Sequence, residues 1–394
     1  MSSAEQIKIE LLKMKSPRQP FCAYLYDVSG MEEHAQSLAA SLPEQVSLYY
    51  AMKANPDPVL LHAVQRHVKG FEAASLGELD KLTAFPDHHK VISGPAKTDE
   101  FLKAAITREI RMIHAESMWE IERIHFIAQL LGKKVRIALR VNLEKAIGKA
   151  RLTMAGKPTQ FGIDESLLPE VMEMVKQLPF IEITGFHFHS VSNNLDAEAH
   201  LAFVRHCIEK VNLWEEMYKV NAQYVNFGGG IGVHYEKQDK PFDWGAFAKG
   251  MHELVREAPD RWELVFELGR YLAGPFGYYA AEVMDVKENH GQAYVSVRGG
   301  THHLRLPAAW KMSHPFEVVA VEEWEYPLSR PELRSKEVWI TGELCTPNDV
   351  LVRGEHCDRV RVGDIILFHF AGAYAWTISH HDFLSHEKPQ MIYI

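Results

Sequence analysis

An alternation of strand-like and helix-like segments runs from the N-terminal region to about residue 267 and limits the folds available to this chain. Each strand-like segment is a short apolar run of the kind that forms buried parallel strands. These runs end near Lys53, Glu72, Ser93, His114, Asn142, His189, Gly228 and Glu267. Eight βα units over roughly 230 residues are the count and length of a TIM barrel, so we predict an α/β fold of the (β/α)8 type.

The pattern changes after about Leu268. Clusters of β-forming residues, bounded by Gly, Pro and Asn, occupy residues 294–297, 316–319, 337–340 and 359–362. They predict a β-rich second domain, and we assign the strand-like Phe21–Val28 to it. The expected domains are a barrel at residues 29–267 and a β-rich domain built from residues 1–28 and 268–394, and two domains are usual for 394 residues.

Composition narrows the class of protein. The formal net charge is −9 and no long basic run occurs, which argues against a nucleic-acid partner. No stretch is long and apolar enough to predict a membrane span, and residues 1–15 do not resemble a secretion signal. The four cysteines lack CxxC spacing, and the histidine pairs are adjacent, which makes them poor chelates. We therefore expect a cytoplasmic enzyme that acts on a small molecule and binds no metal.

Lys53 follows the apolar run Val46–Met52, and Asn55-Pro56-Asp57-Pro58 then begins a helix. Asp57 is expected to be its N-cap and Pro58 its first residue. A lysine at the end of a buried strand is poorly hydrated, which favours the neutral, nucleophilic amine. This is the property that a lysine carrying pyridoxal phosphate (PLP) requires. The alternative is a lysine held in an ion pair at the rim of the barrel.

Two other strand ends carry polar chemistry. Glycines 228–230 would let backbone amides approach a phosphate closely, although a tight βα turn gives the same string. Glu267 would keep the pyridine nitrogen of PLP protonated, and Arg270 would bind phosphate. Alternatively, Glu267 and Arg270 could form an ion pair with each other at a domain edge.

Histidine 189 lies in a strand-like segment on the same face as His187. Its ring could stack on a flat cofactor, with Ser192 and Asn193 adding hydrogen bonds, or it could be a core histidine. Ser75 to Glu78 matches a capping box, so we assign Glu78 to helix initiation and not to chemistry.

Two loops of the second domain hold further candidates. Cys345 lies in a turn-rich loop, although a free cysteine is more often a small apolar filler. Tyr374 lies in another loop, from which its phenol could reach phosphate or substrate.

These motifs, in this order, resemble the fold type III PLP-dependent decarboxylases, the ornithine and diaminopimelate decarboxylase group, from about residue 20 to 390. The resemblance implies an alanine racemase-like barrel with PLP on Lys53, His189 over the cofactor and Cys345 as proton donor. The implied cofactor-binding residues are Lys53, Glu72, Arg140, His189, Ser192, Gly228, Gly229, Gly230, Glu267, Arg270 and Tyr374. It also implies a homodimer in which the Cys345 loop completes the partner's site. The sequence departs from the family at Leu268, where proline is usual.

Thr346 stands where basic-amino-acid decarboxylases have an acidic residue that reads the distal ammonium of the substrate. Like charges about 4 Å apart repel by roughly 4 kcal/mol near a protein surface, so losing the carboxylate favours a distal anion. The expected substrate-binding residues are His302, His303, Arg305, Thr346 and Asp349.

These segments look most like the branch that serves staphyloferrin B- or achromobactin-type siderophores. That branch implies decarboxylation of N-citryl-2,3-diaminopropionate to citryl-ethylenediamine. A decarboxylase of free diaminopimelate or ornithine, an amino-acid racemase and a non-catalytic PLP carrier are the alternatives.

Overall fold

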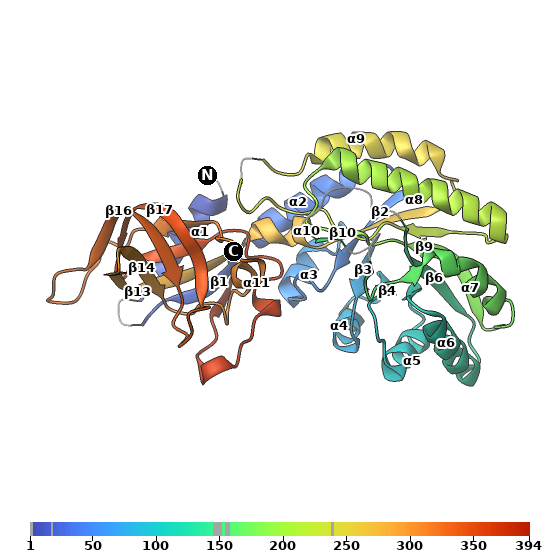
Figure 1. Ribbon diagram of the computed structural model, residues 1–394, viewed down its shortest axis with the longest axis horizontal. Helices are drawn as coiled ribbons and strands as arrows, with labels where there is room; N and C mark the ends of the chain where they lie inside the picture. Colours follow the sequence, from blue (N-terminus) through green and yellow to red (C-terminus); the bar gives the residue numbers. More distant parts are fainter. Residues whose placement is uncertain (1–2, 17–18, 145–151, 154–157, 238–239) are drawn as a thin grey trace. The chain divides into compact units, whose positions relative to one another are not determined.

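The computed structural model describes residues 3–16, 19–144, 152–153, 158–237 and 240–394 (Figure 1). They group into two compact units. One consists of Glu32–His234 and Lys240–Leu272, and the other of the remaining described residues. The predicted domain boundaries, 28/29 and 267/268, compare with unit boundaries at 31/32 and 272/273.

The first unit is a closed barrel of eight parallel strands, in which β5 pairs with β6 to complete the ring. The strands are β2 (Val46–Ala51), β3 (Gly70–Ala73), β4 (His89–Ile92), β5 (Met112–Ala115), β6 (Val135–Asn142), β9 (Ile181–His187), β11 (Tyr224–Asn226) and β12 (Glu263–Leu268). A short strand β8 (Ile163–Asp164) adds to β6. Every strand ends within two residues of its predicted position. The predicted TIM barrel is confirmed.

Helices alternate with these strands and lie around the outside of the ring in Figure 1. They are α2 (Val28–Ala40), α3 (Pro58–Val64), α4 (Leu76–Lys81), α5 (Asp99–Thr107), α6 (Met118–Leu131), α7 (Leu168–Val175), α8 (Ala197–Tyr218), α9 (Trp244–Leu254) and α10 (Arg270–Ala273). Among the helices that the structure describes, none has both the length and the apolar character that a membrane crossing needs.

Local sequence signals set where two of these helices begin. Asp57 caps α3 by accepting a hydrogen bond from the amide of Val59, with Pro58 as the first helical residue, as predicted. Ser75 caps α4 by accepting from the amide of Glu78 at 3.2 Å. The Glu78 carboxylate accepts from the amide of Ala74, one residue before the cap, so the predicted capping box is shifted at this end.

The second unit is a mixed β-sheet organised on the long strand β13 (Gly277–Asn289). Its other strands are β1 (Cys22–Tyr26), β14 (Gln292–Val297), β15 (Phe316–Val319), β16 (Glu332–Thr341), β17 (Val350–Arg361), β18 (Ile365–Phe368) and β19 (Gln390–Tyr393). β1 pairs antiparallel with β13 and parallel with β19, so the N-terminal strand belongs to this sheet as predicted. The sequence patterns did not reveal β13, β18 or β19.

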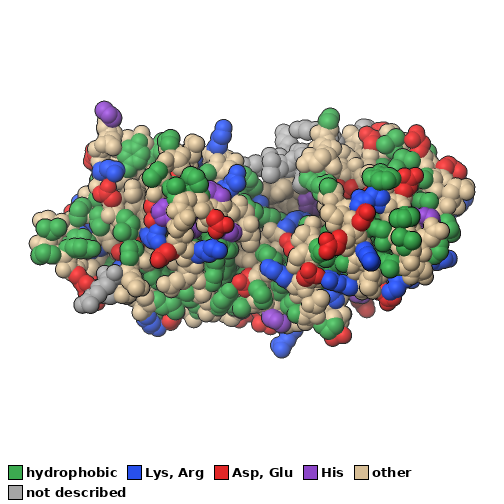
Figure 2. All heavy atoms as spheres, turned by 90° about the horizontal axis from the view of Figure 1, so that it is seen from below, with side chains coloured by type: hydrophobic (Ala, Val, Ile, Leu, Met, Phe, Trp, Pro, Cys, Tyr) green, Lys and Arg blue, Asp and Glu red, His purple; other side chains and the backbone are tan. Residues whose placement is uncertain are grey.

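Helix α1 (Ser3–Met14) covers part of this sheet. It buries Ile7 and Leu11 in the same apolar cluster as Phe21, Leu25 and Ile365. On the face shown in Figure 2, acidic and basic side chains are interspersed over both units and form no continuous basic stripe.

Candidate active site

Lys53 follows β2 and is held by a buried carboxylate. Its Nζ donates a hydrogen bond at 2.8 Å to Oε2 of Glu72, at the end of β3. The other oxygen of Glu72 accepts from the hydroxyl of Ser93, which follows β4. The side chain of Glu72 is fully buried, whereas that of Lys53 is about one third exposed. Three neighbouring strand ends therefore orient an amine that remains accessible to small molecules.

The turn after β11 is packed so closely that its glycines are required. Gly228 and Gly230 have φ values of +69° and +104°, a region that favours glycine. A Cβ on Gly229 would lie 2.3 Å from the carbonyl oxygen of Glu267. The amides of Gly228 and Gly229 donate to Asn226 Oδ1 at 2.7 Å and His189 Nδ1 at 3.1 Å. Both amides are therefore engaged inside the barrel, and the predicted role of Gly228, Gly229 and Gly230 in phosphate binding stays a prediction.

Glu267, in β12, is a buried carboxylate with one oxygen left for a ligand. Its Oε1 accepts a hydrogen bond from Asn226 Nδ2 at 2.8 Å. Its Oε2 lies 3.8 Å from Nε2 of His187, too far for a hydrogen bond, and accepts none from the described part of the chain. The protonated ring nitrogen of PLP is a donor suited to this oxygen.

His189 presents a neutral ring. Burial, followed by the positive charges of Lys53 and Arg140, holds the pKa of His189 well below its usual value. Since Nδ1 accepts the amide hydrogen of Gly229, the single ring proton lies on Nε2. A neutral imidazole in a fixed tautomer is suited to stack against a flat cofactor, as predicted for this residue.

Arg140, in β6, is buried beneath the same end of the barrel. Its Nη1 donates to Oε1 of Glu116 at 2.8 Å, and its guanidinium lies 4.8 Å from the centre of the Phe161 ring. Of the other predicted cofactor-binding residues, Ser192 lies in β10 (Val191–Ser192), and Arg270 begins α10 and is almost fully buried.

Sequence reasoning gave no role to two buried polar residues near Glu267. Asn226 is the last residue of β11, and His114 occupies an interior position of β5. A polar residue inside a buried strand was the available signal. The Oδ1 of Asn193 accepts a hydrogen bond from the amide of Val233 at 3.0 Å, and its predicted contact with the cofactor stays a prediction.

The Cys345 loop lies in the β-rich unit, where the thiol of Cys345 is exposed and free. Both oxygens of Asp349 accept backbone amide hydrogens, from Thr301 at 2.6 Å and from Leu344 at 2.9 Å. Burial raises the pKa of Asp349. This carboxylate therefore clamps the loop to the segment after Gly300, which favours a positioning role over direct contact with substrate. Thr346 is half-buried beside the thiol.

The predicted anion-binding segment contains two buried histidines. Burial lowers the pKa of His302 to about 4 and that of His303 to about 3, so both are neutral near pH 7. Neutral imidazoles can hydrogen-bond a carboxylate but add no positive charge. The charge attraction expected for this segment therefore falls to Arg305, which is exposed.

Tyr374 lies in a loop with unusual backbone geometry. Its φ is +51°, and that of Phe370 is +54°. Two non-glycine residues in the left-handed region within one short loop indicate stored strain, which is common at ligand sites.

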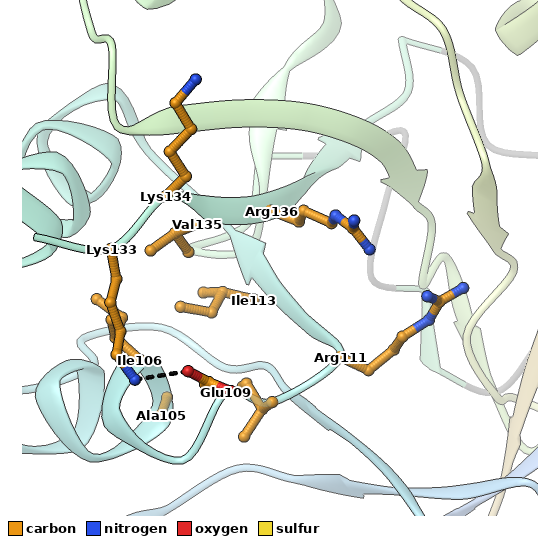
Figure 3. A pocket seen from close by; sticks show the side chains of 10 residues that line it. Ala105, Ile106, Glu109, Arg111, Ile113, Lys133, Lys134, Val135 and Arg136 are labelled. Carbon is orange, nitrogen blue, oxygen red and sulfur yellow. Dashed lines mark hydrogen bonds and ion pairs between the residues drawn. The ribbon is translucent and has the colours of Figure 1, made fainter.

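A cavity of about 480 Å³ lies where β5 and β6 begin (Figure 3), whereas Glu72 and Glu267 lie near the carboxyl ends of their strands. Two of the four basic side chains that line it have hydrogen-bond partners: Lys133 bonds Glu109 at 2.7 Å, and Arg111 bonds Glu263 at 2.9 Å. Catalytic residues of such barrels gather at the carboxyl ends of the strands, so we do not assign the active site here.

An accessible lysine beside a buried carboxylate, a glycine turn and a buried glutamate are groups suited to a PLP site on a (β/α)8 barrel. The family described as "Pyridoxal-dependent decarboxylase, pyridoxal binding domain" matches residues 28–274. The chain belongs to this family of PLP-dependent carboxy-lyases.

Individual relatives cover nearly the whole chain. A Staphylococcus aureus protein named 2-[(L-alanin-3-ylcarbamoyl)methyl]-2-hydroxybutanedioate decarboxylase is 42% identical over 98% of this chain and 96% of its own. The L-glutamyl-[BtrI acyl-carrier protein] decarboxylase of Niallia circulans is 32% identical over 93% of this chain and 87% of its own. Among solved structures, a mutant of Helicobacter pylori diaminopimelate decarboxylase in complex with L-lysine superposes with a TM-score of 0.85 at 24% identity, covering 98% of this chain and 93% of that one. That superposition shows the shared fold.

Proposed function

We propose that this protein decarboxylates an amino-acid conjugate in siderophore biosynthesis, converting N-citryl-2,3-diaminopropionate to citryl-ethylenediamine. The observation that carries the proposal is the 42% identity, over 98% of the chain, to the Staphylococcus aureus decarboxylase. The substrate in that protein's name is the amide of citrate with the side-chain amine of 2,3-diaminopropionate. It has carboxylates, and no ammonium group, at its distal end.

The composition of the candidate substrate-binding residues supports a distal anion. Thr346 places a hydroxyl where an acidic residue would repel a carboxylate, and the exposed Arg305 supplies a permanent positive charge. The Niallia circulans relative is likewise named for a conjugated amino acid. Both observations favour a conjugate over a free diamino acid.

Each residue of the site has a definite task. PLP, when bound, accepts the electron pair left on Cα as CO₂ departs. Lys53 holds the cofactor, Glu267 keeps the ring nitrogen protonated, and His189 covers one face of the ring. Cys345 delivers the proton that replaces CO₂ on Cα.

We also propose that the active enzyme is a cytoplasmic homodimer in which Cys345 acts in the partner's site. The exposure of this thiol in the single chain supports the assignment, because a proton donor must reach substrate. The test is to mix Lys53→Ala and Cys345→Ala variants, each inactive alone. Hybrid dimers hold one intact site, so about a quarter of wild-type activity should return on random exchange. No recovery, with exchange verified by differential tagging, would show that each chain uses its own cysteine.

The substrate is tested by incubating the PLP-loaded protein with citryl-diaminopropionate, meso-diaminopimelate, ornithine and lysine, and identifying products by mass. Loss of CO₂ from the citryl conjugate alone is expected. Turnover of a free diamino acid in preference to the conjugate would overturn the substrate assignment. Inverted configuration at Cα without CO₂ release would indicate a racemase.

A further inference from the structure

One backbone amide determines which atoms donate and which accept in the hydrogen-bond network around Glu267. The amide of Gly228 can only donate, so the atom of Asn226 that faces it at 2.7 Å is the carbonyl oxygen. The amide nitrogen of Asn226 therefore faces Tyr224 and Glu267, and donates to the phenol oxygen at 2.5 Å and to Oε1 at 2.8 Å.

The same donor and acceptor roles determine the tautomer of His114. The Tyr224 phenol lies 3.0 Å from Nε2 of His114, and because its oxygen already accepts from Asn226, its proton points to that nitrogen. Burial, with the neighbouring His187, holds the pKa of His114 well below its usual value, so the ring is neutral. A neutral imidazole that accepts on Nε2 carries its proton on Nδ1.

The Nδ1–H of His114 faces the Glu267 carboxylate. Nδ1 lies 3.7 Å from Oε1 and has no hydrogen-bond partner among the residues that the structure describes. The ring is held in place by His187, which stacks on it with centroids 4.0 Å apart and planes 20° apart. Both side chains are buried, with exposures of 0% for His114 and 1% for Glu267.

We propose that His114 is a positioning residue for Glu267: locked as the Nδ1–H tautomer through Gly228, Asn226 and Tyr224, it directs a donor at Oε1. A carboxylate in a dry interior keeps its charge when donors surround it. With Asn226 and His114 both on the Oε1 side, Oε2 is left for the pyridine nitrogen, and the shared proton stays on the ring nitrogen. This inference rests on the proposed pairing of Glu267 with that nitrogen.

His114, His187 and Glu267 place ligand-type atoms within 4.8 Å of one another. The tautomer argues against a metal site, because a nitrogen that carries a proton has no lone pair for a metal. We therefore assign the Nδ1–H of His114 to an interaction with Glu267 and not to a metal site.

Two substitutions of His114 separate the roles of its two ring nitrogens, Nδ1 and Nε2. In His114→Asn the amide group replaces the Nδ1 side of the ring and can still point an N–H at Glu267. In His114→Gln it reaches the Nε2 side and serves Tyr224 alone. The readout is the ¹⁵N resonance of PLP labelled at the pyridine nitrogen, which separates protonated from neutral rings, together with PLP affinity and kcat at one fixed pH.

We expect wild type and His114→Asn to show the protonated signal, and His114→Gln to shift toward the neutral one. His114→Gln should bind PLP but lose up to about 10-fold in kcat, because it removes an N–H that points at the carboxylate from 3.7 Å rather than a full hydrogen bond, with little change in KM. Tyr224→Phe removes the hydroxyl that fixes the tautomer of His114, and it should shift the ¹⁵N signal in the same direction.

Glu267→Gln is the reference. If it neutralises the ring nitrogen while His114→Gln does not, the role of His114 is wrong and the role of Glu267 stands. If Glu267→Gln leaves the nitrogen protonated, the proposed pairing of Glu267 fails as well.

Discussion

The Nζ of Lys53 lies 2.8 Å from the fully buried Oε2 of Glu72, so the reactive amine is held by a charge from the next strand of the barrel. Glu72 is itself fixed by the hydroxyl of Ser93. The direction of the lysine therefore depends on three consecutive βα units and not on its own loop alone.

Replacing Lys53 by alanine should abolish covalent attachment of PLP and lower kcat at least about a thousandfold. Borohydride reduction followed by mass analysis should show cofactor fixed to wild-type protein and none fixed to the variant. Lys103→Ala, an exposed lysine on α5, is the matched control and should behave as wild type. Cofactor still attached in Lys53→Ala would assign the attachment to another lysine.

Gly229→Ala should weaken PLP binding by about tenfold or more, the usual cost of overpacking a tight site. The added Cβ would lie 2.3 Å from the Glu267 carbonyl oxygen and displace the end of β12. The matched control is Gly77→Ala in α4, where the nearest atom to the new Cβ is 4.0 Å away. That control should keep wild-type affinity and gain up to about 1 kcal/mol in unfolding free energy. Equal PLP affinities for the two variants, measured by fluorescence titration, would contradict the assignment of the turn.

Arg305→Ala should raise KM for the citryl conjugate by about 10-fold or more and change kcat little, because a charge-assisted hydrogen bond to a distal carboxylate is lost. Arg305→Lys should recover part of the loss. Arg334→Ala, an exposed arginine on β16, serves as the control. An unchanged KM in Arg305→Ala would refute the anionic-arm assignment.

Stability should fall on acidification because His200 is buried as a neutral ring. Burial lowers its pKa to about 4, so the unfolded chain binds a proton that the folded chain does not. Its contribution is complete above about pH 6.5, the unfolded value, and is lost as the pH falls toward the folded value. Between pH 7.5 and 5.0 this amounts to about 2 kcal/mol.

Urea unfolding at these two pH values measures the effect. In His200→Phe the loss of stability between them should be smaller by about that amount than in wild type. His356→Gln, at an exposed site on β17, should leave the wild-type difference unchanged. A His200→Phe variant with the full wild-type pH dependence would show that other groups account for it.

The barrel could be predicted because its strands are buried on both sides and so appear as continuous apolar runs. Strand ends then located Lys53, Glu72 and Glu267, since parallel strands deliver their last residues to one end of the ring. The strands of the β-rich unit were harder to predict from the sequence. Strand β13 changes from buried residues at Tyr278–Val283 to mostly exposed ones at Met284–Asn289, so no single alternation runs along it.

The orientation of side chains was the part that sequence could not supply. Asp349 could be identified as lying near Cys345, but the two backbone amides that occupy its carboxylate come from contacts set by the fold. Likewise, pattern alone cannot show that His302 and His303 are buried deeply enough to be neutral.

The pairing of β1 with both β13 and β19 has a consequence for biosynthesis. Ala23 lies opposite Gln390 and Ala280. β1, the first strand of this sheet to be synthesised, therefore cannot pair with β13 and β19 until much later in synthesis. The barrel, whose strands follow one another in the sequence, can close while the ribosome is still adding the β-rich unit. During that interval β1 is an unpaired apolar strand, and contacts of such long sequence separation form slowly. Yield on expression should therefore depend on chaperone supply more strongly than the stability of the finished protein would suggest.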